Sequence, residues 1–200
     1  MIRGQVSYGG INDLIYHLYR DAFSEVCTYR YRMTDEGDVL LLQALWPSMG
    51  PAAQPEQIFF ESAEGERVAL LNWEERGWWL GDRFHLFLTG QEAALALIQE
   101  HWHIVDRLLL HLPRYRVDLM DGNALEVRGN RYGESLYEIF ALPAAGSNAT
   151  DEDGIRLGEI THPASGPTYV LRTESPLLVN VPLFLLALSV VVDLWGLKRE

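Results

Sequence analysis

The chain has 200 residues, enough for one domain or at most two, and 48% of them are hydrophobic, which suffices for a sizeable core. Its formal net charge of −12 argues against nucleic acid as a partner, because the phosphate backbone repels an acidic chain. A single cysteine, Cys27, excludes an internal disulfide and any metal site built from several cysteines. The start of the sequence lacks the basic and apolar segments of a signal peptide, so we expect a cytoplasmic protein.

The first predicted element is an amphipathic helix that precedes the strands. Its apolar residues recur at helical spacing, at Ile11, Leu14, Ile15, Leu18, Ala22 and Phe23. Its polar positions carry charges of both signs rather than a lysine-rich face, so we expect it to pack against the domain rather than lie on a membrane. Residues 1–26 are therefore predicted to form an N-terminal helical extension.

From Cys27 onward, short apolar runs alternate with polar residues and are separated by turn residues at regular spacing. Asp121-Gly122-Asn123 is a strong hairpin turn, since Gly and Asn tolerate positive φ. The run Ala93 to Gln99 has helical propensity, but we predict a strand because hairpins flank it. Eleven or twelve strands over residues 27–181, with no Pro/Ser-rich linker, predict one mainly β domain, a sandwich or a barrel.

The last apolar stretch, residues 182–197, is predicted to form a helix that is apolar on every side. Pro182 suits the first turn of a helix, Gly196 suits its end, and no charge occurs before Asp193. A helix of this kind lies either in a membrane or inside a protein.

The order of these pieces resembles the tubby C-terminal-like superfamily, which includes LURP-one-related proteins, phospholipid scramblases and many bacterial proteins. The similarity rests on repeated hairpins with a Gly-containing turn, such as Tyr115…Gly122…Val127, followed by the apolar helix with Asp193 near its end. The resemblance implies a single domain over residues 1–200, in which a closed antiparallel β-barrel of about twelve strands surrounds the buried hydrophobic C-terminal helix. We expect a bacterial member of the group.

A membrane-spanning interpretation of the same helix remains open. Ser175 to Val192 is uncharged and long enough to indicate a spanning segment. However, Asn180 and Pro182 interrupt the run, and the part from Pro182 to Asp193 is shorter than the roughly twenty residues that cross a bilayer. We favour a buried helix and keep as an alternative a scramblase-like, membrane-associated protein anchored by this helix.

The pattern His101-Trp102-His103 is the sharpest indication of a metal site. On a strand, His101 and His103 point to the same face, and Asp106 follows closely. Zinc commonly takes His and carboxylate ligands, so a metal-dependent hydrolase that uses these residues is a second alternative. Pairs of surface histidines are ordinary, however, and we expect no cofactor.

Four arginines form the candidate ligand-binding site. Arg114 and Arg116 share one strand face, and Arg128 and Arg131 are expected to join them across the hairpin. In the tubby branch a basic surface binds phosphoinositide headgroups, and arginine forks suit phosphate. The competing interpretation is a solvated strand face with ion pairs from Arg116 or Arg128 to Glu126.

The sequence shows no Gly-rich phosphate loop, no nucleophile elbow and no acid pair with catalytic spacing. We therefore expect a non-enzymatic binding or adaptor module for phospholipid headgroups or a protein partner, with membrane association that is at most peripheral. Asp193 is a carboxylate near an apolar helix end and must find a partner there. We expect a structural hydrogen bond or ion pair at Asp193 rather than chemistry.

Overall fold

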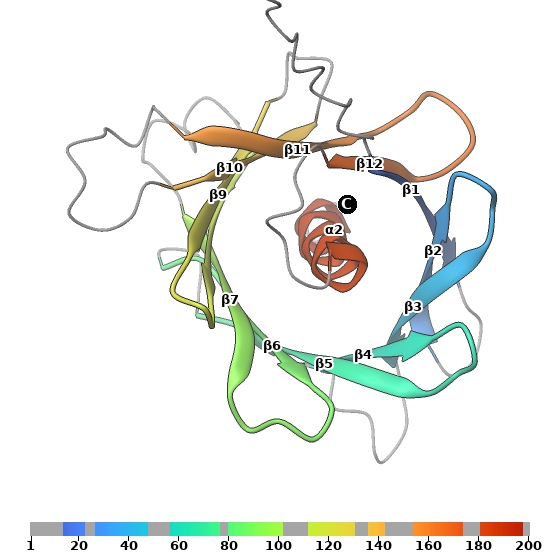
Figure 1. Cartoon of the computed structure of the whole chain (residues 1–200), viewed down its shortest axis with the longest axis horizontal. Coiled ribbons are helices and arrows are strands. Elements are labelled where there is room, and N and C mark those ends of the chain that lie inside the picture. The colour runs from blue at the N-terminus through green and yellow to red at the C-terminus, as the bar shows by residue number, and fades with distance from the viewer. Residues whose placement is uncertain are drawn as a thin grey trace, which may run out of the picture.

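The computed structural model of the chain describes residues 14–22, 27–47, 57–76, 80–101, 112–130, 136–142, 154–173 and 181–197. In this part of the chain, twelve antiparallel strands form a closed barrel around one helix, which confirms the predicted fold class (Figure 1). Each strand pairs with the next one in sequence, and the last strand pairs with the first. The strands are β1 (Leu14–Ala22), β2 (Cys27–Asp35), β3 (Leu40–Pro47), β4 (Gln57–Ser62), β5 (Arg67–Glu74), β6 (Arg83–Leu88), β7 (Ala94–His101), β8 (Arg114–Leu119), β9 (Ala124–Gly129), β10 (Tyr137–Ala141), β11 (Ile155–Thr161) and β12 (Tyr169–Thr173).

Strand β1 shows that the predicted N-terminal helix was wrong for residues 14–22; the rest of that segment lies outside the described residues. Tyr16 and Leu18 point into the barrel and are 7% and 0% exposed, whereas His17 and Tyr19 point outward. A spacing of four residues, as between Leu14 and Leu18, fits both a helix and a strand face, so periodicity alone misled the prediction. The backbone pairing of β1 with both β12 and β2 is what closes the barrel.

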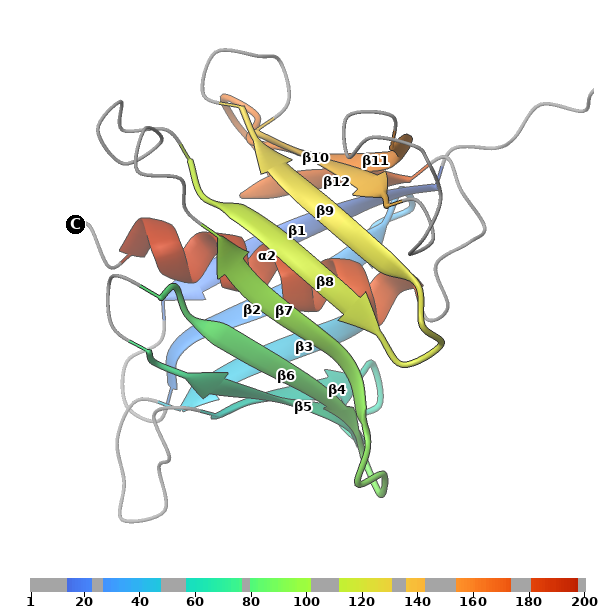
Figure 2. The same cartoon turned by 90° about the vertical axis from the view of Figure 1, so that its left-hand side faces the viewer.

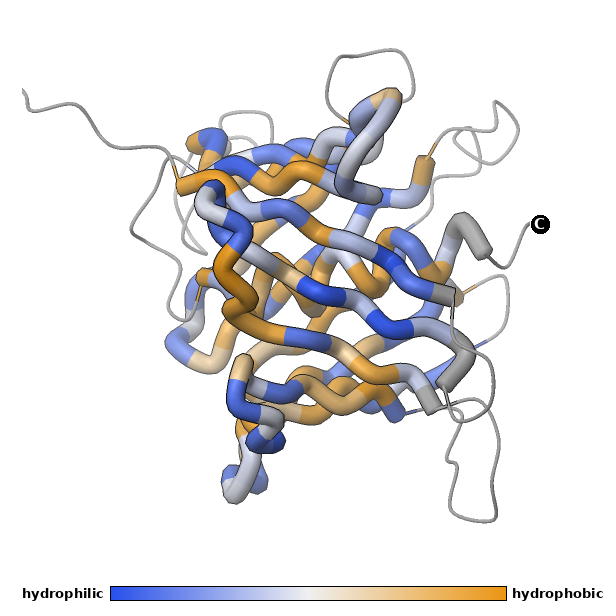
Figure 3. Tube along the Cα trace, turned by 90° about the vertical axis from the view of Figure 1, so that its right-hand side faces the viewer, coloured by the Kyte–Doolittle hydropathy of each residue, from blue (hydrophilic) through white to orange (hydrophobic). Residues whose placement is uncertain are grey.

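The wall of the barrel follows the two-residue period of the sequence. On β8, Tyr115 and Val117 are buried inside while Arg114 and Arg116 are on the outside. The same alternation appears as changing hydropathy along the strands that face the viewer in Figure 3. The hairpin turn at Gly122 has φ of 86°, as predicted, and the run from Ala94 is a strand.

Helix α2 (Val181–Leu197) lies inside the barrel and runs along it, as Figures 1 and 2 show. Its side chains from Leu183 to Leu194 are at most 6% exposed, which confirms the predicted burial on every side. The hydroxyl of Ser189 donates to the backbone carbonyl of Leu185 at 2.7 Å, so this polar group is satisfied within the helix. Among the described residues, no helix combines the length and apolarity needed to cross a bilayer.

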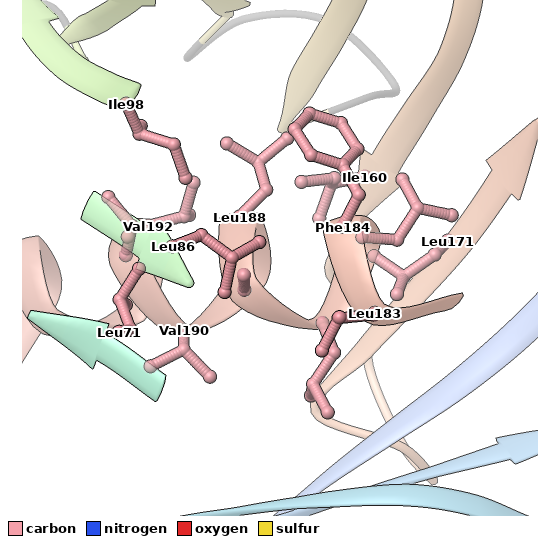
Figure 4. Close-up of a cluster of buried hydrophobic side chains, with 14 of the residues drawn as sticks. Leu71, Leu86, Ile98, Ile160, Leu171, Leu183, Phe184, Leu188, Val190 and Val192 are labelled. Carbon is pink, nitrogen blue, oxygen red and sulfur yellow. The ribbon is translucent and has the colours of Figure 1, made fainter. Parts of the chain in front are cut away.

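The core is the contact surface between α2 and the inner wall. Figure 4 shows helix side chains and strand side chains directed toward one another, with Leu71, Leu86 and Ile98 on β5 to β7 and Ile160 and Leu171 on β11 and β12. Each fully buried Leu, Ile or Phe contributes about 1.5–3 kcal/mol relative to exposure. Burial of apolar area thus explains why the helix is inside and why most charged residues are outside.

Candidate functional site

Three of the four candidate arginines lie together on the outer wall of the barrel. Arg114 and Arg116 project from β8 and Arg128 projects from β9, with Arg114 directly opposite Arg128 in the strand register. On the other side of Arg114, the directly opposite residue on β7 is His101. Figure 2 shows these three strands side by side. Arg131 lies outside the described residues.

Two carboxylates accompany these arginines. Glu126 lies 2.6 Å from Arg128 and 3.7 Å from Arg114, while Asp118 accepts a hydrogen bond of 3.0 Å from Arg116. The ion pair between Arg128 and Glu126 follows the sequence-based alternative, whereas Arg116 bonds to its own strand. We call Arg114, Arg116, Arg128, Glu126 and Asp118 the arginine face.

The arginine face has an excess of positive charge in a chain that is strongly acidic overall. Three guanidinium groups stand against two carboxylates, which leaves one positive charge. Like charges directly opposite each other on neighbouring strands are destabilising, and Glu126 relieves this between Arg114 and Arg128. The Arg128 guanidinium also stacks 4.4 Å from the ring centre of Phe140, which orients its fork. An anion placed between Arg114 and Arg128 would meet donors from two strands.

The neighbouring strands differ from this face because their charges are balanced more closely. The cross-strand row that contains Arg128 continues through Glu138, Glu159 and Arg172. Arg156 lies 3.1 Å from Glu138 and 2.6 Å from Glu159. Between β8 and β12, the positive excess is therefore a property of β8 and β9.

The candidate metal ligands are only partly within the described residues. His101 is exposed at the end of β7, and His103 and Asp106 lie outside the described part of the chain. In the part that is described, no group of three His, Cys, Asp or Glu side chains is arranged to hold a metal ion. The zinc site stays a prediction.

A second polar site lies inside the barrel, where Asp193 of α2 meets three strands. Asp193 is 3% exposed, and both of its oxygens accept hydrogen bonds from Nη1 of Arg20 at 3.0 and 2.9 Å. Its Oδ2 also accepts a hydrogen bond from the Tyr31 hydroxyl at 2.8 Å, and its Oδ1 accepts one from the Tyr169 hydroxyl at 2.7 Å. We call these four side chains the Asp193 cluster. The expected structural partner of Asp193 is therefore present.

The protonation states within the Asp193 cluster follow from its burial and its charges. Burial raises the pKa of Tyr31 and of Tyr169, and the negative charge of Asp193 raises both further. Burial acts to lower the pKa of Arg20, but the hydrogen bond and the charge of Asp193 outweigh it and raise that pKa. Both phenols thus remain neutral donors and the guanidinium remains charged wherever the protein is folded.

Sequence reasoning identified Asp193 but none of its partners. The alternation Tyr29-Arg30-Tyr31-Arg32-Met33 does place Tyr31 on one face with Met33, which would have marked it as inward-facing. Arg20 escaped detection because its segment was interpreted as a helix. No local pattern could link these residues, since Arg20 and Asp193 are 173 positions apart.

Comparison with known proteins adds information about the fold. No family model matches the chain, and no curated protein matches its sequence. Among solved structures, the X-ray structure of a protein from Arabidopsis thaliana is similar, with a TM-score of 0.59 and 15% sequence identity over 94% of each chain. At this identity the similarity shows a shared fold, and it extends over nearly the whole length of both proteins.

Proposed function

We propose that this protein is a non-enzymatic binding module of the tubby-like type, and that the arginine face takes a phosphate-bearing phospholipid headgroup. One observation carries the proposal: Arg114 and Arg128 are directly opposite each other and both lie close to Glu126. The superfamily resemblance and the full-length barrel support the same class of function.

The chemistry of the two arginines favours phosphate over other anions. A guanidinium presents parallel N–H donors that match two phosphate oxygens, and two guanidinium groups on adjacent strands can bind one phosphate from both sides. The phosphate would also replace the repulsion between Arg114 and Arg128 with two attractive contacts. Arg114 and Arg116 are 43% and 51% exposed, so a headgroup at a membrane surface can reach them without rearrangement of the barrel.

The overall charge sets the expected selectivity. The net charge of −12 repels an anionic surface, and this repulsion acts over roughly 8–10 Å at physiological salt. Binding must therefore come from direct contact with a headgroup rather than from long-range attraction. We expect preference for headgroups with several phosphates over a general preference for anionic membranes.

The test is sedimentation of the full chain with vesicles of phosphatidylcholine alone, with added phosphatidylserine, or with added phosphoinositide. Wild-type protein should sediment with the phosphoinositide vesicles most strongly. The double variant Arg114→Gln/Arg128→Gln should lose about 30-fold in affinity, because each arginine near a charged membrane contributes about 1 kcal/mol. The variant Glu126→Gln should bind several-fold more tightly, since it removes the carboxylate that both arginines contact.

The matched control is Arg32→Gln/Arg67→Gln, which removes the same charge from other outer strands. It should bind like wild type. The proposal is wrong if no vesicle retains the protein, or if the two double variants lose affinity equally. If an acidic protein binds through Arg114 and no vesicle binds, the ligand is that protein and not a lipid headgroup.

A further inference from the structure

The interior of the barrel contains a polar feature that the proposed binding function does not use. Asp193 is the one ionisable residue between Val181 and Leu197, and it lies in the C-terminal half of a helix that is otherwise almost entirely apolar. Removing a carboxylate from water is costly unless it is paired and hydrogen-bonded, and here four hydrogen bonds reach it. Because burying this carboxylate costs free energy, we ask what Asp193 contributes to the structure.

The partners of Asp193 come from three neighbouring strands, and two of these are the strands whose pairing closes the barrel. Arg20 is on β1, Tyr31 on β2 and Tyr169 on β12, and the pairing of β1 with β12 joins the first and last strands. The backbone N–H of Arg20 also donates to the Thr168 hydroxyl oxygen at 2.9 Å, just before β12. One helix side chain is therefore bonded to both strands that close the barrel.

Apolar contacts alone do not define how the helix is seated. Hydrophobic burial is non-directional, and similar apolar residues occur on every side of α2. A shift by one residue would turn the helix by about 100° and move it by about 1.5 Å, which replaces one Leu or Val by another at each contact. The same shift would separate Asp193 from all three of its partners.

We infer that the Asp193 cluster sets the rotation and depth of α2 inside the barrel and holds the paired strands β1 and β12 against it. Its geometry supports this role, because the three donors converge on one carboxylate at 2.7–3.0 Å from fixed positions on the wall. Buried polar residues have this register-setting role in other helical assemblies.

The test compares the full-length wild-type chain with Asp193→Leu by methyl NMR of Leu and Val side chains and by hydrogen exchange. Leucine has the same branched shape, although it is larger, and keeps the interior apolar, and Arg20 is 31% exposed, so its charge can turn to water. We expect Asp193→Leu to show several sets of methyl signals for α2, and amide exchange at least tenfold faster in α2, β1 and β12. The matched control is Asp21→Asn, which removes a carboxylate from an arginine pair on the outside of β1 and should give one set of signals.

A second variant tests the same inference if Asp193→Leu does not fold. Tyr31→Phe/Tyr169→Phe keeps the Arg20–Asp193 pair and the ring volumes but removes two of the hydrogen bonds. It should accelerate exchange in α2 at least tenfold relative to Tyr19→Phe. The inference is overturned if a folded Asp193→Leu, or the double Phe variant in its place, retains one set of α2 signals and wild-type exchange.

Discussion

Two arginine–aspartate pairs that involve adjacent residues of β1 show what burial does to one kind of interaction. Arg20 points into the barrel and bonds to Asp193, whereas the next residue, Asp21, points outward and bonds to Arg32 of β2. The closest contacts are similar, at 2.9 and 2.7 Å. The carboxylate of the inner pair is 4% exposed and that of the outer pair is 39% exposed.

The two pairs should therefore differ in energy despite their similar geometry. Water screens the outer pair and can solvate either partner when the other is removed, so its contribution is about 0–1 kcal/mol. Removing one partner of a buried pair leaves an uncompensated charge and costs about 3–5 kcal/mol. The distance between the charged groups therefore does not predict how much a pair contributes to stability, whereas the exposure of the groups does.

The largest expected effect of the polar interior appears at alkaline pH. Burial raises the pKa of Tyr16, Tyr31, Tyr115 and Tyr169 above the ordinary value of about 10, whereas the unfolded chain ionises near that value. The stability that depends on these neutral phenols is therefore complete below pH 10 and is lost as pH rises above it. The three with strongly raised pKa, Tyr31, Tyr115 and Tyr169, together lower the free energy of unfolding by roughly 4 kcal/mol per pH unit.

This prediction is checked by recording tyrosinate absorbance and far-UV circular dichroism across an alkaline titration. A late, cooperative rise in absorbance should coincide with loss of the β-sheet signal. Gradual ionisation of all nine tyrosines while the sheet signal stays native would contradict it.

Next in size is the cost of removing the inner carboxylate charge. Asp193→Asn replaces the charged acceptor of the hydrogen bonds from Arg20, Tyr31 and Tyr169 by a neutral amide and should lower the free energy of unfolding by about 3 kcal/mol or more, measured in urea. A double-mutant cycle with Arg20→Gln should show a coupling energy above about 1 kcal/mol, because the two side chains act as one unit. Additive effects of the two substitutions would mean that the inner pair behaves like a surface pair.

A smaller effect is expected from the phenols that bond to Asp193. Tyr169→Phe removes one hydrogen bond to a charged acceptor and should cost about 1.5–3 kcal/mol. Tyr19→Phe removes a contact of 3.5 Å to Asp38 on the outside of the same barrel and should cost almost nothing. Equal costs for the two substitutions, measured by urea unfolding, would show that burial does not separate the inner from the outer hydroxyls.

Much of the fold follows from patterns within short stretches of sequence. Hairpin turns such as Asp121-Gly122-Asn123 and the two-residue alternation predict strands, and the apolar residues 182–197 predict a helix with no surface for water. The segment that became β1 could not be assigned this way, because Leu14 and Leu18 fit both a strand and a helix. Its pairing with β12 joins residues at opposite ends of the sequence.

The candidate sites were predicted only in part, for a related physical reason. Strand alternation and the hairpin placed Arg114, Arg116 and Arg128 on one face, but they did not show that Glu126 lies between Arg114 and Arg128. The partners of Asp193 depend on the closure of the barrel and on the depth of the helix, and neither is encoded in a local pattern.

The smallest expected effect comes from the outer pair and completes the comparison. Arg32→Gln should lower the free energy of unfolding by less than about 1 kcal/mol at low salt, because both partners are about 40% exposed and water replaces the lost contact. Added salt should remove most of this difference, since screening at 1 M acts over about 3 Å. The cost of Asp193→Asn should remain large in the same salt, because ions do not reach a carboxylate with 4% exposure. Urea unfolding of Arg32→Gln and Asp193→Asn at low and high salt measures how each cost in unfolding free energy depends on salt. An outer pair that resists salt, or an inner pair that weakens with it, would mean that something other than burial separates them.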